Sequence, residues 1–202
     1  MALRARYPAA ASLRGAIAGV LLALGGCAAG PVAPDWQFEA RAALEAFERH
    51  YLAGQTRLAE IEFARLRAVV RATGRPDLLA RVELARCAVR AAALEFDDCP
   101  GFEALRRDAG PEELDYAEYL AARRARTVSE EPLARLVAAA VAFRAGTVTP
   151  EAIGAAIEIS SAQGWRRPLL AWLEVQVRRA ETAGEREAAA RLRRRIATLL
   201  GE

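Results

Sequence analysis

The chain has 202 residues, enough for one domain with a substantial core, and 53% of them are hydrophobic. Its 29 basic and 26 acidic residues give a net charge of +3, but residues 1–26 contain three arginines and no acid. Residues 27–202 are therefore electrically balanced. This argues against a nucleic-acid-binding surface, so we expect no nucleic-acid partner.

The first 26 residues have the features of a secretory signal peptide. Arg4, Arg6 and Arg14 form a basic start, and an apolar run follows over residues 16–24. The run is much shorter than the roughly 20 apolar residues that a membrane-spanning helix needs. The pattern predicts export with removal of residues 1–26.

The end of this run, Leu24-Gly25-Gly26-Cys27, resembles the lipobox of bacterial lipoproteins. In that family a diacylglycerol is attached to the cysteine thiol, and the chain is cut just before that residue. The resemblance implies a lipid anchor on Cys27 and a short tether over 27–34, followed by a single domain over 35–202. Because Ala28 is not an aspartate, the family's sorting rule implies the periplasmic face of the outer membrane; retention at the inner membrane is the alternative.

Apolar residues then recur every three or four positions, which is typical of helices that bury one face. The first expected helix follows Asp35 as a possible N-cap and continues to residue 51, and the second covers 58–74. A third begins near Asp77 and reaches Phe96. Residues 97–110 read as a broken region with one short helix.

Helix-start and helix-stop residues place the remaining elements. Helices are expected from Pro111, from Ser129 to Gly146 and from Thr149-Pro150 to Gly164. Two more are expected from Pro168 to Gly184 and over 185–200. No stretch alternates apolar and polar residues as a half-buried strand would. The sequence therefore predicts an all-α fold of about eight antiparallel helices joined by short turns.

Two of the expected hairpins share a local pattern. Ala53-Gly54 and Ala183-Gly184 each end a helix, and Ala59 and Ala189 follow the glycine by five positions. This resembles the turn of tetratricopeptide repeats, although the 34-residue period and the tryptophan and proline positions of that family are missing. The resemblance implies a repeat-like solenoid of helical hairpins; a compact irregular bundle is the alternative.

Two cysteines remain after Cys27. An even number in an oxidising compartment favours a disulfide between Cys87 and Cys99, with two unpaired thiols as the alternative. Two cysteines and one distant histidine have no zinc-site spacing, so neither a metal nor a cofactor is expected.

The segment Gly164-Trp165-Arg166-Arg167-Pro168, with Trp172 one turn later, is the strongest candidate for a partner-binding surface. Tryptophan and arginine are enriched in binding hot spots, and a loop between helices would expose them. The alternative is that one tryptophan packs in the core while an arginine covers it. A structural role is expected for His50 at a helix end, and for the basic run over 191–195 as a solvated helix face.

These features lead to three functional hypotheses. The first is a non-catalytic, lipid-anchored helical scaffold that docks an envelope protein or peptide partner. The second is an envelope enzyme or cell-wall hydrolase accessory that uses acids such as Glu113 and Asp115. The third is a small-ligand binder with a helix-lined interior near Trp165 and Trp172.

Overall fold

The computed structural model describes residues 34–202, which form one compact unit. The predicted signal peptide, the predicted lipidation site Cys27 and nearly all of the tether lie outside the described residues. None of the described helices is both long and apolar enough to span a membrane.

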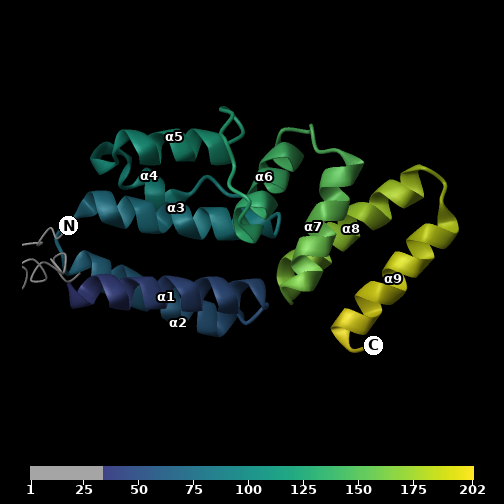
Figure 1. Cartoon of the computed structure of the whole chain (residues 1–202), viewed down its shortest axis with the longest axis horizontal. Coiled ribbons are helices and arrows are strands. Elements are labelled where there is room, and N and C mark those ends of the chain that lie inside the picture. The colour runs from purple at the N-terminus through teal and green to yellow at the C-terminus, as the bar shows by residue number, and fades with distance from the viewer. Residues whose placement is uncertain (1–33) are drawn as a thin grey trace, which may run out of the picture. The chain divides into compact units, whose positions relative to one another are not determined.

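The described residues form nine α-helices and one 3-10 turn, and they contain no strand, so the prediction of an all-α fold is confirmed (Figure 1). Eight of these helices have ten or more residues, which agrees with the expected number. The short elements lie in the predicted broken region. The elements in chain order are α1 (Asp35–Leu52), α2 (Thr56–Arg71), α3 (Pro76–Ala92), α4 (Pro100–Glu103), η1 (Arg106–Asp108), α5 (Pro111–Leu120), α6 (Pro132–Arg144), α7 (Pro150–Ala162), α8 (Arg166–Thr182) and α9 (Arg186–Leu200).

Several predicted helix boundaries need correction. Asp35 is the first residue of α1 rather than its cap, and α6 begins at Pro132 instead of following Ser129. The third helix stops at Ala92, before Phe96, because Leu94 adopts a left-handed conformation with φ 60°. The start at Thr149 is confirmed, since its side chain accepts a hydrogen bond from the Ala152 N–H.

The turn pattern found in the sequence has a clear physical basis. Gly54 and Gly184 have φ values of +85° and +77°, which glycine adopts without the strain that a Cβ would cause. Hydrogen bonds from Gln55 N to His50 O (2.8 Å) and from Glu185 N to Ala180 O (2.8 Å) close each turn. Ala59 and Ala189, at 0% and 1% exposure, pack where the following helix approaches its partner.

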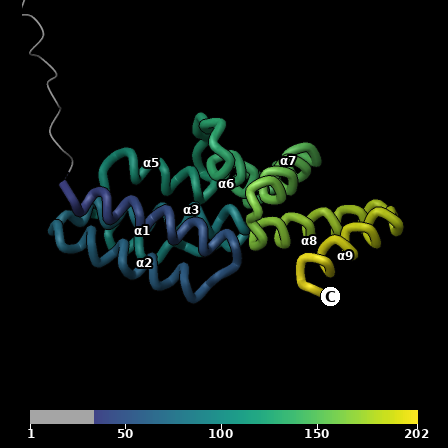
Figure 2. The backbone as a smooth tube through the Cα atoms, turned by 60° about the horizontal axis from the view of Figure 1, so that its bottom comes forward, coloured from purple at the N-terminus to yellow at the C-terminus, as the bar shows by residue number. Residues whose placement is uncertain are grey.

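The packing is organised around α3, which contacts α1, α2, α4, η1, α5 and α6. From α6 onward each helix packs on the next, and α1 also contacts α8. In Figure 2 the α8–α9 hairpin continues beyond the end of the α1–α2 hairpin, and α8 begins near the end of α1. Contacts such as α1 with α8 join elements far apart in the chain, whereas each repeat of a simple solenoid contacts only its neighbours. The tetratricopeptide-like solenoid stays a prediction.

The core has two connected parts. One lies among α1, α2 and α3, where the ring centroid of Phe47 is 5.8 Å from that of Tyr51 and 5.1 Å from that of Phe63. Each such aromatic pair contributes about 1 kcal/mol beyond its burial. The larger part extends from α3 to α8 and surrounds the fully buried Trp172.

Candidate functional site

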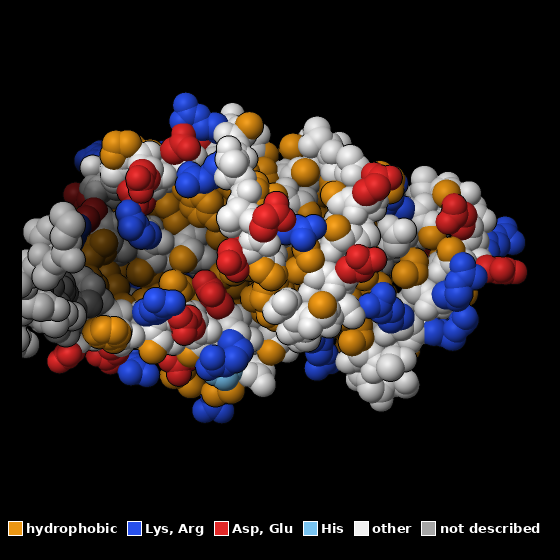
Figure 3. All heavy atoms as spheres, in the orientation of Figure 1, with side chains coloured by type: hydrophobic (Ala, Val, Ile, Leu, Met, Phe, Trp, Pro, Cys, Tyr) orange, Lys and Arg blue, Asp and Glu red, His pale blue; other side chains and the backbone are white. Residues whose placement is uncertain are grey.

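The main candidate site is an open hollow of about 390 Å³ between α1, α3, α5 and α6. This volume lies within the range of ordinary ligand and peptide pockets. Figure 3 shows hydrophobic side chains gathered between α5 and α1, with charged side chains along both edges. The floor is formed by side chains that the helices turn toward the core, namely Leu84, Ala88, Val89 and Val137.

A second hollow of about 320 Å³ adjoins the first and extends past α1 to Trp165. Glu48 and Leu133 line both hollows, so the two adjoin at these residues. We call this combined surface the acidic groove because its lining has five glutamates and three arginines. These charged residues are Glu45, Glu48, Glu112, Glu113, Glu131, Arg49, Arg81 and Arg126.

Glu48 on α1 and Tyr116 on α5 line the groove. Burial, and then the charge of Glu45, raises the pKa of the Glu48 carboxyl group. Burial raises the pKa of Tyr116 to about 12, and the proximity of Glu48 adds to the shift. The guanidinium carbon of Arg126 is 5.3 Å from the Tyr116 ring centroid and covers this ring. The groove is thus a place where ionisation is costly, as is common at functional sites.

The acids of the second hypothesis are all paired with arginines. Arg81 Nε donates to Glu113 Oε1 at 2.7 Å across the gap between α3 and α5, and Glu113 is only 8% exposed. Asp115 pairs with Arg124 and, at 3.6 Å, with Arg126. Because each carboxylate is neutralised by a guanidinium, these acids brace α5 against its neighbours.

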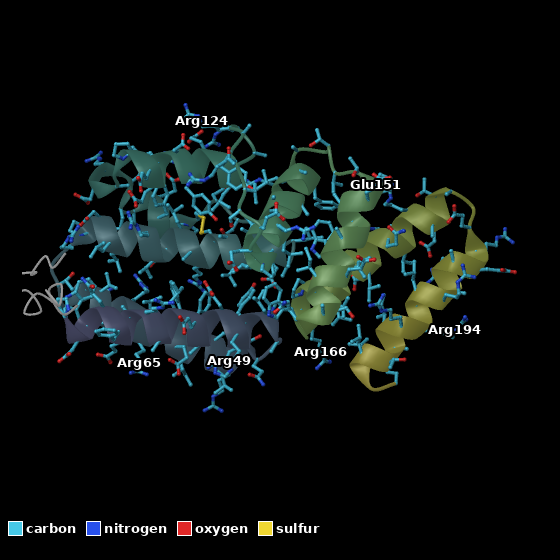
Figure 4. All side chains as sticks on the ribbon, viewed as in Figure 1. Arg49, Arg65, Arg124, Glu151, Arg166 and Arg194 are labelled. Carbon is cyan, nitrogen blue, oxygen red and sulfur yellow. A yellow bond between two sulfur atoms is a disulfide. The ribbon has the colours of Figure 1, made fainter. Side chains whose placement is uncertain are left out.

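The predicted partner-binding residues separate into different environments. Trp165 is half-buried and lines the end of the acidic groove. Arg166 is exposed, and Figure 4 shows it pointing away from the helices. Only Trp165 of the four lies in the groove.

Arg167 connects α8 to α1, to α2 and to the segment that follows α3. Its guanidinium donates to the Tyr51 backbone carbonyl (2.9 Å), to Glu95 Oε1 (2.9 Å) and to Thr56 Oγ1 (2.5 Å). The Tyr51 hydroxyl in turn donates to Glu95 Oε2 at 2.6 Å. Each of the three guanidinium nitrogens thus donates to a partner within the fold, so Arg167 holds these segments together.

The expectation that Trp172 takes part in binding is wrong. Its side chain is 0% exposed, and its indole N–H donates to the Ala92 carbonyl at 3.1 Å. A buried tryptophan with its one donor satisfied is a core residue. This also separates Trp172 from Trp165, which the third hypothesis placed together.

Cys87 and Cys99 form a disulfide, as predicted, with their Cα atoms 5.9 Å apart (Figure 4). Asp97 lies close enough to complete a three-ligand cluster with the two sulfurs. The sulfurs are bonded to each other, and Asp97 already accepts from Arg90 and from the Cys99 N–H. The disulfide therefore fixes the segment between α3 and α4.

The remaining sequence candidates lie at helix ends and on solvated faces. His50 Nδ1 forms a hydrogen bond with Gln55 Oε1 (2.5 Å) at the end of α1. In the basic run, Arg193 pairs with Glu181 and Arg191 lies 4.0 Å from Glu187. These contacts agree with the structural roles expected for both features.

Another hollow, of about 460 Å³, lies between α4 and α5. Four of its charged residues pair with one another: Arg106 with Glu103 at 2.8 Å, and Arg123 with Glu118 at 2.6 Å. Asp97, which also lines it, pairs with Arg90. The half-buried acids of this hollow, Asp97 and Glu118, thus both have an arginine partner, whereas the half-buried Glu48 of the acidic groove is in no ion pair among the described residues.

No protein-family model matches the chain, and neither a curated protein nor a solved structure is significantly similar to it. Sequence reasoning missed Glu48 and Tyr116 as site residues. The only sequence signal was indirect: Glu48 adjoins the buried Phe47, which places it at the edge of the apolar face of its helix.

Proposed function

We propose that this protein is a lipid-anchored scaffold of the bacterial envelope that docks a protein partner in the acidic groove. Cys27 carries the anchor, and the helical domain faces the periplasm from the outer membrane. The single observation that carries the docking role is the groove: it is open, apolar in its floor and charged at its edges. This anatomy is typical of surfaces that receive a helix or peptide.

The sequence around Cys27 supports the anchor. Each buried methylene of an attached acyl chain contributes about 0.8 kcal/mol, so two or more chains hold a protein firmly without spanning the membrane. Mass spectrometry of the chain from its native host tests this half of the proposal. We expect an acylated N-terminal Cys27; an unmodified Cys27 with residues 1–26 still attached would contradict it.

Photocrosslinking in intact cells tests the docking half. A benzophenone amino acid replaces Ala134 in the groove, and a control chain carries it at the exposed Ala64 on α2, outside both hollows. We expect a discrete protein adduct from position 134 only, and a weaker adduct in the Cys27→Ser background. Equal labelling from both positions would count against docking.

A further inference from the structure

The acidic groove contains two carboxylates that have no counter-charge of their own. Glu45 lies 2.9 Å from Arg41, and Glu113 lies 2.5 Å from Arg81. By contrast, within residues 34–202, no arginine or histidine nitrogen lies within 4 Å of a carboxylate oxygen of Glu48 or Glu131. Charges that are partly removed from water are normally paired.

Glu48 is the more informative of the two because it is half-buried, whereas Glu131 is exposed. The groove arginine nearest to it in sequence, Arg49, is exposed on the same helix. Arg126 is occupied by the Tyr116 ring and Asp115. The groove therefore keeps an unpaired carboxylate although it has arginines of its own.

Apolar side chains lie on both sides of this carboxylate. Leu84 and Val137 form the floor of one hollow, and Leu52 and Trp165 line the other. Because Glu48 lines both hollows, it lies where they meet. The surface thus has an apolar patch, then a negative charge, then another apolar patch.

We infer that the acidic groove binds a basic amphipathic segment of a protein partner, with an arginine or lysine side chain on Glu48 and apolar side chains in the two hollows. This inference rests on the proposed docking function and adds the chemistry of the partner. Charge complementarity selects this occupant: a cation on Glu48 relieves an unpaired charge, whereas an anionic lipid head group or a nucleic-acid phosphate is repelled.

Peptide selection on the purified full chain in mild detergent tests the inference. The probe is a phage-displayed library of random 12-residue peptides, and enriched peptides are synthesised for affinity measurement. We expect each to contain an arginine or lysine flanked by apolar residues. Glu48→Gln should weaken their binding at least tenfold, and Glu48→Arg should shift the preference to peptides with glutamate in place of the basic residue.

Glu158→Gln is the matched control, because Glu158 is an exposed carboxylate on α7 outside the groove and should change affinity less than twofold. Thermal melts show that each variant folds. Enriched peptides without a basic residue, equal effects of the two glutamine variants, or no enrichment would overturn the inference. If the crosslink from position 134 forms in cells but the selected peptides show no preference for arginine or lysine, only the inference about the partner's chemistry fails. If the selected peptides do contain basic residues but no crosslink forms in cells, the proposed docking function is rejected instead.

Discussion

Arg167 at the start of α8 lies over the ring of Tyr51 near the end of α1, with its guanidinium carbon 4.2 Å from the ring centroid. The two residues are 116 positions apart in the chain. The same guanidinium donates to the Tyr51 carbonyl and to Glu95, so it connects the first hairpin and the end of α3 to the last hairpin. This contact maintains the side of the acidic groove where Trp165 lies.

Replacing Arg167 should therefore destabilise the whole domain. We expect Arg167→Ala to lower the free energy of unfolding by about 2 kcal/mol, because it leaves the Tyr51 carbonyl and Glu95 without their shared donor. Urea unfolding measures the change. Arg166→Ala is the neighbouring control, since Arg166 is exposed, and it should stay within about 0.5 kcal/mol of the wild type. Equal effects of the two would show that Arg167 does not join the hairpins.

The disulfide should stabilise the domain by restricting the unfolded chain. Cys87 and Cys99 are 12 positions apart, and closing a loop of this length contributes about 3 kcal/mol in the chain-entropy estimate. We expect Cys87→Ala, Cys99→Ala and the double variant to lose similar amounts, as measured by urea unfolding. A reductant should destabilise the wild type but none of the variants. Unchanged wild-type stability under full reduction would contradict this prediction.

The carboxyl group of Glu48 should cost the protein stability at neutral pH. The pKa of this carboxyl group is higher in the folded state than in the unfolded chain. Below the pKa of the unfolded chain the group is protonated in both states and costs no stability; as the pH rises through the pKa of the folded state, the buried carboxylate ionises and the free energy of unfolding falls. Glu48→Gln removes the cost. We expect the variant to be more stable than the wild type by about 0.5 kcal/mol at pH 7, after allowing for solvent screening.

This gain should disappear below about pH 4, where Glu48 is protonated in both states. Urea unfolding of both proteins at several pH values measures the difference. A glutamine variant that is less stable than the wild type at pH 7 would mean that the carboxylate has a partner within the fold.

The two tryptophans of the α8 region should respond in opposite ways. Trp165→Ala should weaken the binding of a selected basic peptide at least fivefold, because this ring lines the groove, while changing stability by less than about 1 kcal/mol. Trp172→Phe should lower the free energy of unfolding by about 2 kcal/mol, because the buried Ala92 carbonyl loses the indole N–H that donates to it. Peptide affinity should not change. If Trp172→Phe weakened peptide binding and Trp165→Ala did not, the groove would be rejected as the binding surface.

Local features of the fold could be predicted from the sequence because they depend on local physics. Helix periodicity, the glycines at 54 and 184 and the cap at Thr149 each act within a few residues. The disulfide was predicted from the even number of cysteines and the expected oxidising compartment. Left-handed Leu94 and Ala122, at φ 60° and 59°, could not be predicted, because a residue with a Cβ is normally disfavoured there and tertiary packing holds it in place.

The candidate site was less predictable because it depends on contacts between distant segments. Glu48 is an ordinary helical glutamate until α5 brings Tyr116 near it. Composition also could not separate Trp165 from Trp172, since both lie close to Arg166 and Arg167 in the sequence and only the packing of α8 decides which ring is buried. Of the segment that the sequence indicated, only Trp165 lines the proposed groove, and Trp172 is buried in the core.

The most direct test of the central claim, that the acidic groove meets a partner protein in the cell, is the crosslink from position 134 in wild-type and Glu48→Gln backgrounds. The proposal predicts one discrete adduct from the groove, reduced by the glutamine substitution, and none from position 64. An adduct of equal yield at both positions, or none at position 134 in protein that is properly exported, would contradict it.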